Sequence, residues 1–317
     1  MRKRGMRRSA FTLFEIVMVI IVMGIVAMIG TNVIAHMYEG YIRSKSINAL
    51  QQQTETALDM IAKRLQYRVK ATTIVREKGT NNIDWLNSTD LNGTYDVLEW
   101  IGYDYESFRG RYNGILTVPG WSGFVDLENP ATDATKIVTS GSDLDIAVET
   151  IRDLSNGTVD LNDTSGSIQH PAIIFKKLSS YDFKSFGWDW TSTDHNATLR
   201  VHRDPAANNI LVFDENITQQ GVKRLKEQYR LAWTAYAIVP EGDKANDFNL
   251  TLYYNYQPWY GEHYNSSGVG VKKAVIAEHV SSFNFLQSGN TIRLKLCIQD
   301  GNQTGIGIGF CKEKVVF

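Results

Sequence analysis

Residues 11–35 have the sequence FTLFEIVMVIIVMGIVAMIGTNVIA, an almost purely apolar run in which Glu15 is the only ionisable residue. As an α-helix at 1.5 Å per residue, a run of this length reaches about 37 Å, more than the roughly 30 Å hydrocarbon core of a bilayer. Five basic residues and no acidic residue lie within the first ten positions, and such a cluster favours the cytoplasmic side of a membrane. The sequence therefore predicts one membrane-spanning helix, with the rest of the chain outside the cytoplasm.

A secretory signal peptide is the first alternative, because it also combines a basic start with an apolar stretch. The apolar region of a signal peptide is about 7–15 residues long and ends in a small-residue cleavage site, whereas residues 11–35 form a longer run. Glu15 also counts against a plain signal anchor, since a carboxylate costs about 2.5–3.5 kcal/mol at the centre of an inserted helix and less near the interface. A carboxylate in this place needs a specific partner.

The segment Ser9–Ile16 (SAFTLFEI) resembles the prepilin processing and N-methylation motif of type IV pilins and pseudopilins. The resemblance implies that a prepilin peptidase cuts after Ala10, that the new amino group of Phe11 is methylated, and that the apolar segment stays as membrane anchor and filament core. It also implies that Glu15 pairs with the terminal amine of a neighbouring subunit, the cation that a buried carboxylate requires. Ala10 departs from the family, which most often has glycine there. Many pilins have a proline within this segment, but this chain has none before Pro119, which predicts an unbroken helix.

Residues 36–71 predict an amphipathic stalk helix that continues the anchor. Apolar residues recur there at steps of three and four, the period of one helix face: Ile47, Leu50, Ala57, Leu58, Ile61 and Leu65, with Thr54 in the same stripe. The expected organisation is a leader peptide that is removed (1–10), a transmembrane anchor (11–35), the stalk (36–71) and a β-rich periplasmic domain (72–317).

Short apolar and aromatic runs bounded by Gly, Asn and Asp predict that residues 72–317 form antiparallel strands. These runs are Val97–Tyr103, Ile115–Val118, Ala172–Phe175, Leu199–His202, Ile210–Phe213, Leu231–Val239 and Leu250–Tyr256. Alternation is clearest near the C-terminus, where Ile292, Leu294, Leu296 and Ile298 share one face. The predicted fold class is α+β, a long N-terminal helix followed by a large antiparallel sheet domain. At the level of pattern, residues 275–298 resemble the C-terminal part of J-type minor pseudopilins and W-type minor pilins.

Residues 125–174 differ from the rest of the chain, because they contain no Phe, Trp or Tyr and carry nine acidic residues against two basic ones. We expect a solvated insertion that contributes little to the core. The alternative is an interaction surface for a basic partner. Some pseudopilins bind calcium through loop carboxylates, and residues 153–167 are rich in Asp, Asn and Gly, but their spacing matches no EF-hand loop.

Two cysteines, Cys297 and Cys311, lie in the last two expected strands on either side of a glycine-rich turn. In an oxidising compartment this arrangement predicts a disulfide, with two free core thiols as the alternative. The six histidines show no spacing typical of metal ligands, so the sequence predicts no metal site. The seven tryptophans, including Trp188 and Trp190, are expected in core packing, with a carbohydrate or peptide groove as the alternative.

These features favour a minor pilin or pseudopilin, a non-enzymatic subunit near the tip of a type II secretion pseudopilus or type IV pilus. No common catalytic signature occurs, and a net charge of −1 does not favour nucleic acid as a partner. The resemblance implies as partners the prepilin peptidase, other minor subunits, the major subunit and an inner-membrane assembly platform. We expect no cofactor, with calcium at the acidic loop of residues 153–167 as the alternative. The resemblance places the chain in the inner membrane with a periplasmic C-terminal domain. The alternative is a membrane-anchored extracytoplasmic enzyme or ligand-binding protein.

Overall fold

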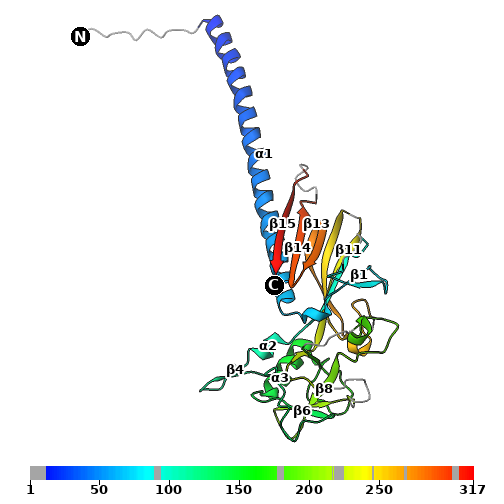
Figure 1. Ribbon diagram of the computed structural model, residues 1–317. Coiled ribbons are helices and arrows are strands. Elements are labelled where there is room, and N and C mark those ends of the chain that lie inside the picture. Colours follow the sequence, from blue (N-terminus) through cyan, green and yellow to red (C-terminus); the bar gives the residue numbers. More distant parts are fainter. Residues whose placement is uncertain are drawn as a thin grey trace, which may run out of the picture.

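The computed structural model describes residues 12–88, 94–176, 182–215, 217, 225–244, 246–267, 270–301 and 307–317. One long helix, α1 (Leu13–Gln66), projects from a mixed globular region and runs along it only with its C-terminal part (Figure 1). The α+β class predicted from the sequence is confirmed.

Helix α1 is unbroken over 54 residues, as the lack of proline predicts. Its glycines, including Gly24 and Gly30, lie in open space and introduce no break. The helix ends at Gln66, somewhat before the predicted end at Ala71, and residues 70–72 form a short 3-10 turn, η1 (Lys70–Thr72). Two basic residues, Lys63 and Arg64, lie in the last turn, where positive charge complements the helix dipole.

The main sheet has eight strands in the order β15-β14-β13-β12-β11-β3-β1-β2, and every neighbouring pair is antiparallel. In chain order the strands are β1 (Ile74–Arg76), β2 (Ile83–Trp85), β3 (Val97–Gly102), β11 (Thr234–Lys244), β12 (Asp247–Tyr256), β13 (Lys272–Ser288), β14 (Thr291–Gln299) and β15 (Gly309–Val316). The last five are consecutive in the chain and adjacent in the sheet, which is the arrangement of a meander.

The C-terminal part of α1 covers one face of this sheet. Its predicted apolar stripe is the buried one, and it packs against the alternating residues of β14. The buried residues are Leu50, Ala57, Leu58, Ile61 and Leu65 on the helix and Ile292, Leu294, Leu296 and Ile298 on the strand. Each fully buried Leu or Ile contributes roughly 1.5–3 kcal/mol, so this contact fixes the helix against the sheet.

The opposite face of the main sheet packs against a second layer. That layer contains a five-stranded sheet, β10-β7-β8-β9-β6, and helix α3 (Leu144–Ser155). Its strands are β6 (Lys136–Val138), β7 (Ala172–Phe175), β8 (Leu199–Arg203), β9 (Ile210–Phe213) and β10 (Tyr229–Ala232). The smaller elements are α2 (Tyr105–Phe108), β4 (Arg111–Tyr112), β5 (Thr117–Val118), η2 (Phe183–Phe186) and η3 (Pro258–Tyr260). One apolar cluster lies between the two sheets and another between the second sheet and α3.

The expectation that residues 125–174 form a solvated insertion is wrong. They include β6, α3 and β7, and their aliphatic side chains form much of the second core. Buried members are Ile137, Leu144, Ile151, Val159, Leu161 and Ile173. Aromatic side chains enter the same core from other segments, namely Trp121, Tyr229 and Trp233. A segment without aromatic residues can therefore build a core when its neighbours supply the bulk.

The predicted packing role of the tryptophans is confirmed. Trp188 is 2% exposed, and its carbonyl accepts a hydrogen bond of 2.9 Å from Nη2 of Arg76. The guanidinium of Arg76 also lies 4.4 Å from the ring centre of Trp190 and forms a fully buried ion pair with Glu99. This network joins β1 and β3 to the segment that covers them. Breaking such a buried pair costs about 3–5 kcal/mol, because the remaining charge is left without a partner.

Candidate functional site

The N-terminal part of α1 presents an apolar surface that nothing in the described chain covers. Large apolar side chains from Leu13 to Tyr41 are exposed all round the helix, for example Phe14 at 72% and Met28 at 71%. Among the described residues, α1 is the one helix that is long and apolar enough to cross a membrane, and none of its apolar window is buried. Within the described chain this segment is therefore not a buried core helix, and an exposed apolar surface of this size typically marks a contact with a membrane or a partner.

Glu15 lies in the first turn of α1, at the edge of this apolar surface. It forms a capping box with Thr12, in which the backbone N–H of Glu15 donates to Oγ1 of Thr12 at 3.3 Å. The Thr12 N–H donates in turn to the carboxylate of Glu15 at 3.4 Å. This geometry satisfies helix N–H groups that lack a helical partner and places the carboxylate at the positive end of the helix dipole. The carboxylate of an isolated chain thus has local partners.

Two predicted site residues, Ala10 and Phe11, lie outside the described residues. Their processing and methylation therefore stay predictions. Glu15 is described, but its partner in the prediction is the terminal amine of a second subunit, and only one chain is present in the structure.

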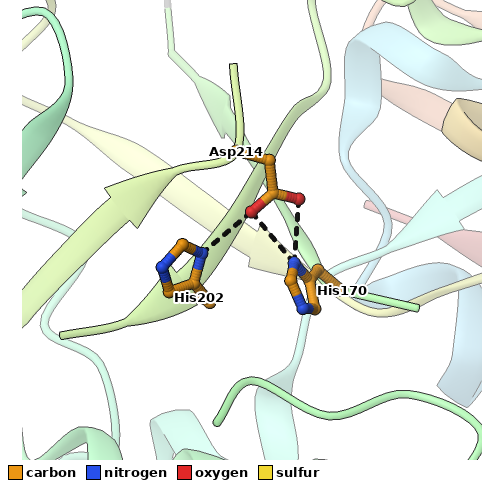
Figure 2. A group of neighbouring side chains, drawn as sticks. All are labelled: His170, His202 and Asp214. Atoms are coloured by element: carbon orange, nitrogen blue, oxygen red, sulfur yellow. Dashed lines mark hydrogen bonds and ion pairs between the residues drawn. The ribbon is translucent and has the colours of Figure 1, made fainter. Parts of the chain in front are cut away.

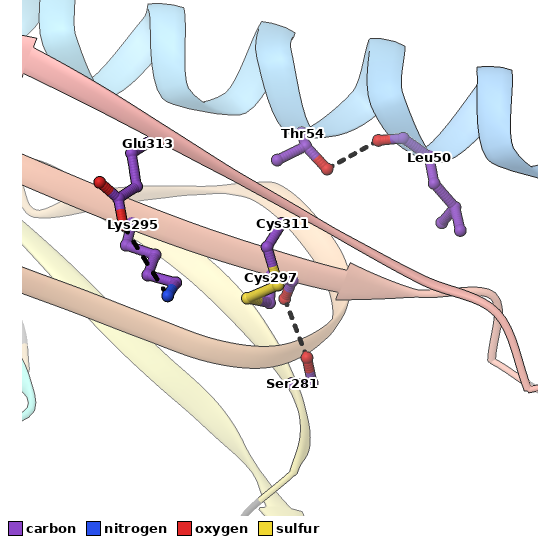
Figure 3. The surroundings of a disulfide bond; sticks show 7 residues. All are labelled: Leu50, Thr54, Ser281, Lys295, Cys297, Cys311 and Glu313. Atoms are coloured by element: carbon purple, nitrogen blue, oxygen red, sulfur yellow. Dashed lines mark hydrogen bonds and ion pairs between the residues drawn. A yellow bond between two sulfur atoms is a disulfide. The ribbon is translucent and has the colours of Figure 1, made fainter.

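The last two strands, β14 and β15, pack against the C-terminal part of α1. Cys297 and Cys311 are directly opposite each other on β14 and β15, and their sulfur atoms are 2.05 Å apart, at disulfide bond distance (Figure 3). The predicted pairing is confirmed. Strand β15 also contacts α1 through two ion pairs, Lys312 with Glu55 at 2.9 Å and Lys314 with Asp59. The C-terminal strand is therefore tied both to the sheet and to the stalk.

A second group of chemically versatile side chains lies in the other layer, where His170, His202 and Asp214 converge (Figure 2). Nδ1 of His170 is 2.9 and 2.8 Å from the two carboxylate oxygens of Asp214, and Nδ1 of His202 is 2.9 Å from one of them. Burial alone would lower the pKa of His170, but the hydrogen bond and charge of Asp214 outweigh it and raise this pKa. Burial would raise the pKa of Asp214, yet the two histidines lower it to about 2.

The spacing along the chain indicates no metal site, yet the fold brings His170 and His202 together with Asp214. Strands β7 and β8 pair with Ala172 opposite Arg200, and two residues further along the same register His170 is opposite His202. Asp214 follows β9 and donates its N–H to the carbonyl of Arg200. Spacing along the chain carries no sign of this convergence. The available signal was cross-strand register, which requires the strand pairing to be known.

In the acidic loop where calcium is the alternative, two carboxylates are engaged within the protein. Asp160 forms an ion pair with Arg152 at 2.5 Å. Asp163 accepts hydrogen bonds of 3.0 Å from the backbone N–H groups of Ser165 and Ile168. A calcium site in residues 153–167 remains a hypothesis without support from this geometry.

No protein-family model, no curated protein and no solved structure matches the chain. The choice of the exposed apolar segment of α1 with Glu15 as the candidate functional site rests on the exposure and composition of this helix alone.

Proposed function

We propose that this protein is a minor pilin or pseudopilin, a non-enzymatic subunit of a type II secretion pseudopilus or a type IV pilus. The observation that carries the proposal is that one unbroken helix is fully exposed and apolar at its N-terminal end and packed under a sheet at its C-terminal end. Such a helix can leave the membrane and enter a bundle of similar helices without refolding the domain that it supports.

In this function the prepilin peptidase removes residues 1–10, and Phe11 becomes the N-methylated terminus. The capping box with Thr12 supports a storage state, because it gives the Glu15 carboxylate local partners while the subunit is single in the bilayer. On assembly, the terminal amine of the neighbouring subunit replaces these partners. The gain is an ion pair in a low-dielectric bundle, where a charge without a partner is costly.

The proposed location is the inner membrane, with the domain after the anchor in the periplasm. The five basic residues within the first ten positions and the disulfide support this orientation. The proposed partners are the peptidase, the major subunit, other minor subunits and the assembly platform. The second candidate is a membrane-anchored extracytoplasmic enzyme or ligand-binding protein, for which Glu15 would have no use.

Mass spectrometry of the N-terminus of the native protein separates the two candidates. We expect a chain that begins at an N-methylated Phe11. A chain that begins at Met1, or one cut after Ala35, would refute the pilin assignment and favour the anchored enzyme or binding protein. An Ala10→Gly variant serves as a positive control, because the family most often has glycine at this position.

A further inference from the structure

The His170, His202 and Asp214 cluster has the composition and placement of a metal site. We propose that these three residues bind one divalent transition-metal ion, preferably Zn²⁺, and that the bound ion links β8 to the ends of β7 and β9. This proposal is independent of the function proposed for the N-terminal helix.

The backbone holds the three ligands on one face of the second sheet. In antiparallel pairing, directly opposite residues point to the same face, so the register places His170 and His202 side by side with Asp214 diagonal to them. The backbone of His170 is fixed further, because its N–H donates to the hydroxyl of Tyr260 at 2.9 Å and its carbonyl accepts from Nε1 of Trp259 at 3.2 Å. The ligands therefore come from β8 and from the residues just before β7 and just after β9, three strands held in fixed register.

The distances among the ligand atoms suit a tetrahedral ion. One nitrogen from each histidine and one carboxylate oxygen all lie within 4.8 Å of one another. Zinc bonds of about 2.0–2.2 Å give separations of roughly 3.3 Å between neighbouring ligand atoms of a tetrahedron. The present Nδ1 to carboxylate distances of 2.8–2.9 Å are shorter, so an ion needs the side chains to move apart by about half an ångström.

The surroundings of His170 are the second, independent observation. Its Nε2 is buried and forms no hydrogen bond within the described part of the chain, and the carboxylate of Asp163 lies 3.6 Å away. Histidine ligands of metals almost always direct their second nitrogen to a carboxylate, carbonyl or water, which fixes the tautomer. If an ion binds at Nδ1, the proton of His170 moves to Nε2 and points to Asp163.

Charge and access also favour an ion here. The two carboxylates of Asp214 and Asp163 balance a charge of +2, while the nearby guanidinium of Arg200 is already paired with Glu215. The side chains of His202 and Asp214 are 19% and 18% exposed, so solvent reaches the site. Two imidazoles and one carboxylate are ligands that zinc accepts, and three protein ligands leave the fourth position for water.

The test is metal binding by the full-length chain, purified in detergent and stripped of metal with a chelator. We measure Zn²⁺ affinity by competition with a chromophoric chelator, and we use Co²⁺ as a spectroscopic substitute whose visible absorption reports tetrahedral coordination. We expect one ion per chain. The variants His202→Ala and Asp214→Asn each remove a ligand and are expected to weaken binding roughly 100-fold or more. Asp163→Asn is expected to weaken it about 10–100-fold while the Co²⁺ spectrum keeps its shape.

His279→Ala is the matched control, because His279 also contacts an aspartate, Asp247 at 3.0 Å, but belongs to no three-ligand group among the described residues. This variant is expected to bind Zn²⁺ as the native chain does. Circular dichroism of the metal-free variants checks that each is folded. If the native chain takes up no Zn²⁺ against the chelator, or if His202→Ala and Asp214→Asn both bind like the control, the cluster is a hydrogen-bonded structural group only and the metal site is refuted.

Discussion

At the scale of single residues, Asp104 is a carboxylate that the fold buries almost completely, at 1% exposure. It caps α2 by accepting the Ser107 N–H at 3.3 Å and the Ser107 hydroxyl. Burial nonetheless dominates and raises the pKa of Asp104 from 3.8 to about 7. Well below pH 4 the group is protonated in both the folded and the unfolded chain, whereas between pH 4 and 7 mainly the unfolded chain ionises. Stability is therefore lost as the pH rises to about 7 and changes no further above it.

We predict that Asp104→Asn, which keeps the oxygen that caps α2, removes this loss. At pH 8 the variant is expected to be more stable than the native chain by up to about 4 kcal/mol, since each pKa unit corresponds to about 1.4 kcal/mol. At pH 4 most of this difference is expected to disappear. Urea unfolding from pH 4 to 8 measures the slope. Ser107→Ala is the control, because loss of the hydroxyl that stabilises the carboxylate raises the pKa of Asp104 further and extends the pH range over which stability falls. Equal slopes in the native chain and Asp104→Asn would contradict the prediction.

At the scale of elements, the terminal strand β15 lies at the edge of the main sheet and is held by one covalent link and two ion pairs. The disulfide closes a loop over a separation of 14 residues, and loop closure of this size stabilises by about 3 kcal/mol. Partly exposed ion pairs contribute at most about 1 kcal/mol each. The disulfide is therefore the main attachment of β15 beyond its backbone hydrogen bonds and apolar contacts.

We predict that the double variant Cys297→Ser/Cys311→Ser lowers the free energy of unfolding by about 3 kcal/mol and speeds amide hydrogen exchange in β15 before other strands. Lys312→Ala and Lys314→Ala serve as controls, each expected to cost less than about 1 kcal/mol. Exchange is followed by mass spectrometry of peptides covering residues 309–316. If the double variant shows the same exchange in β15 as the native chain, backbone pairing and packing alone hold the strand.

The elements also show what a sequence can and cannot predict. Strands β12 and β14 are predicted to within a few residues, because their signals are local: an apolar and aromatic run bounded by turn residues for β12, and the alternation of apolar and polar residues for β14. The role of residues 125–174 was not predicted, since the aromatic residues that complete their core come from elsewhere in the chain. The convergence of His170, His202 and Asp214 was missed for a related reason. It depends on the register between strands, which local patterns do not specify.

At the scale of the whole molecule, α1 has two environments that meet within one helix. Its C-terminal part is part of the domain core, while its N-terminal part is apolar and exposed. The apolar side chains of the exposed part can pack against lipid tails and against other helices alike. Within the described part of the apolar run 11–35, Glu15 is the one ionisable group. It distinguishes lipid from a helix bundle, because a cation from a neighbouring subunit is available only in an assembly. Under the proposed function, the resemblance to pseudopilins, whose tip subunit lacks this glutamate, implies a position below the tip for this chain.

We therefore predict that Glu15→Leu inserts into the membrane and folds like the native chain but is incorporated into the filament several-fold less. Glu39→Leu is the matched control, because this carboxylate belongs to the same helix, is 70% exposed and lies beyond the apolar run of residues 11–35. The amount of each variant in sheared filaments, relative to the amount in the inner membrane, measures incorporation. Crosslinking from position 15 to the N-terminus of a neighbour reports the contact directly. If Glu15→Leu is incorporated as well as Glu39→Leu and the native chain, the ion pair does not recruit this subunit, and its placement next to a tip subunit loses its support.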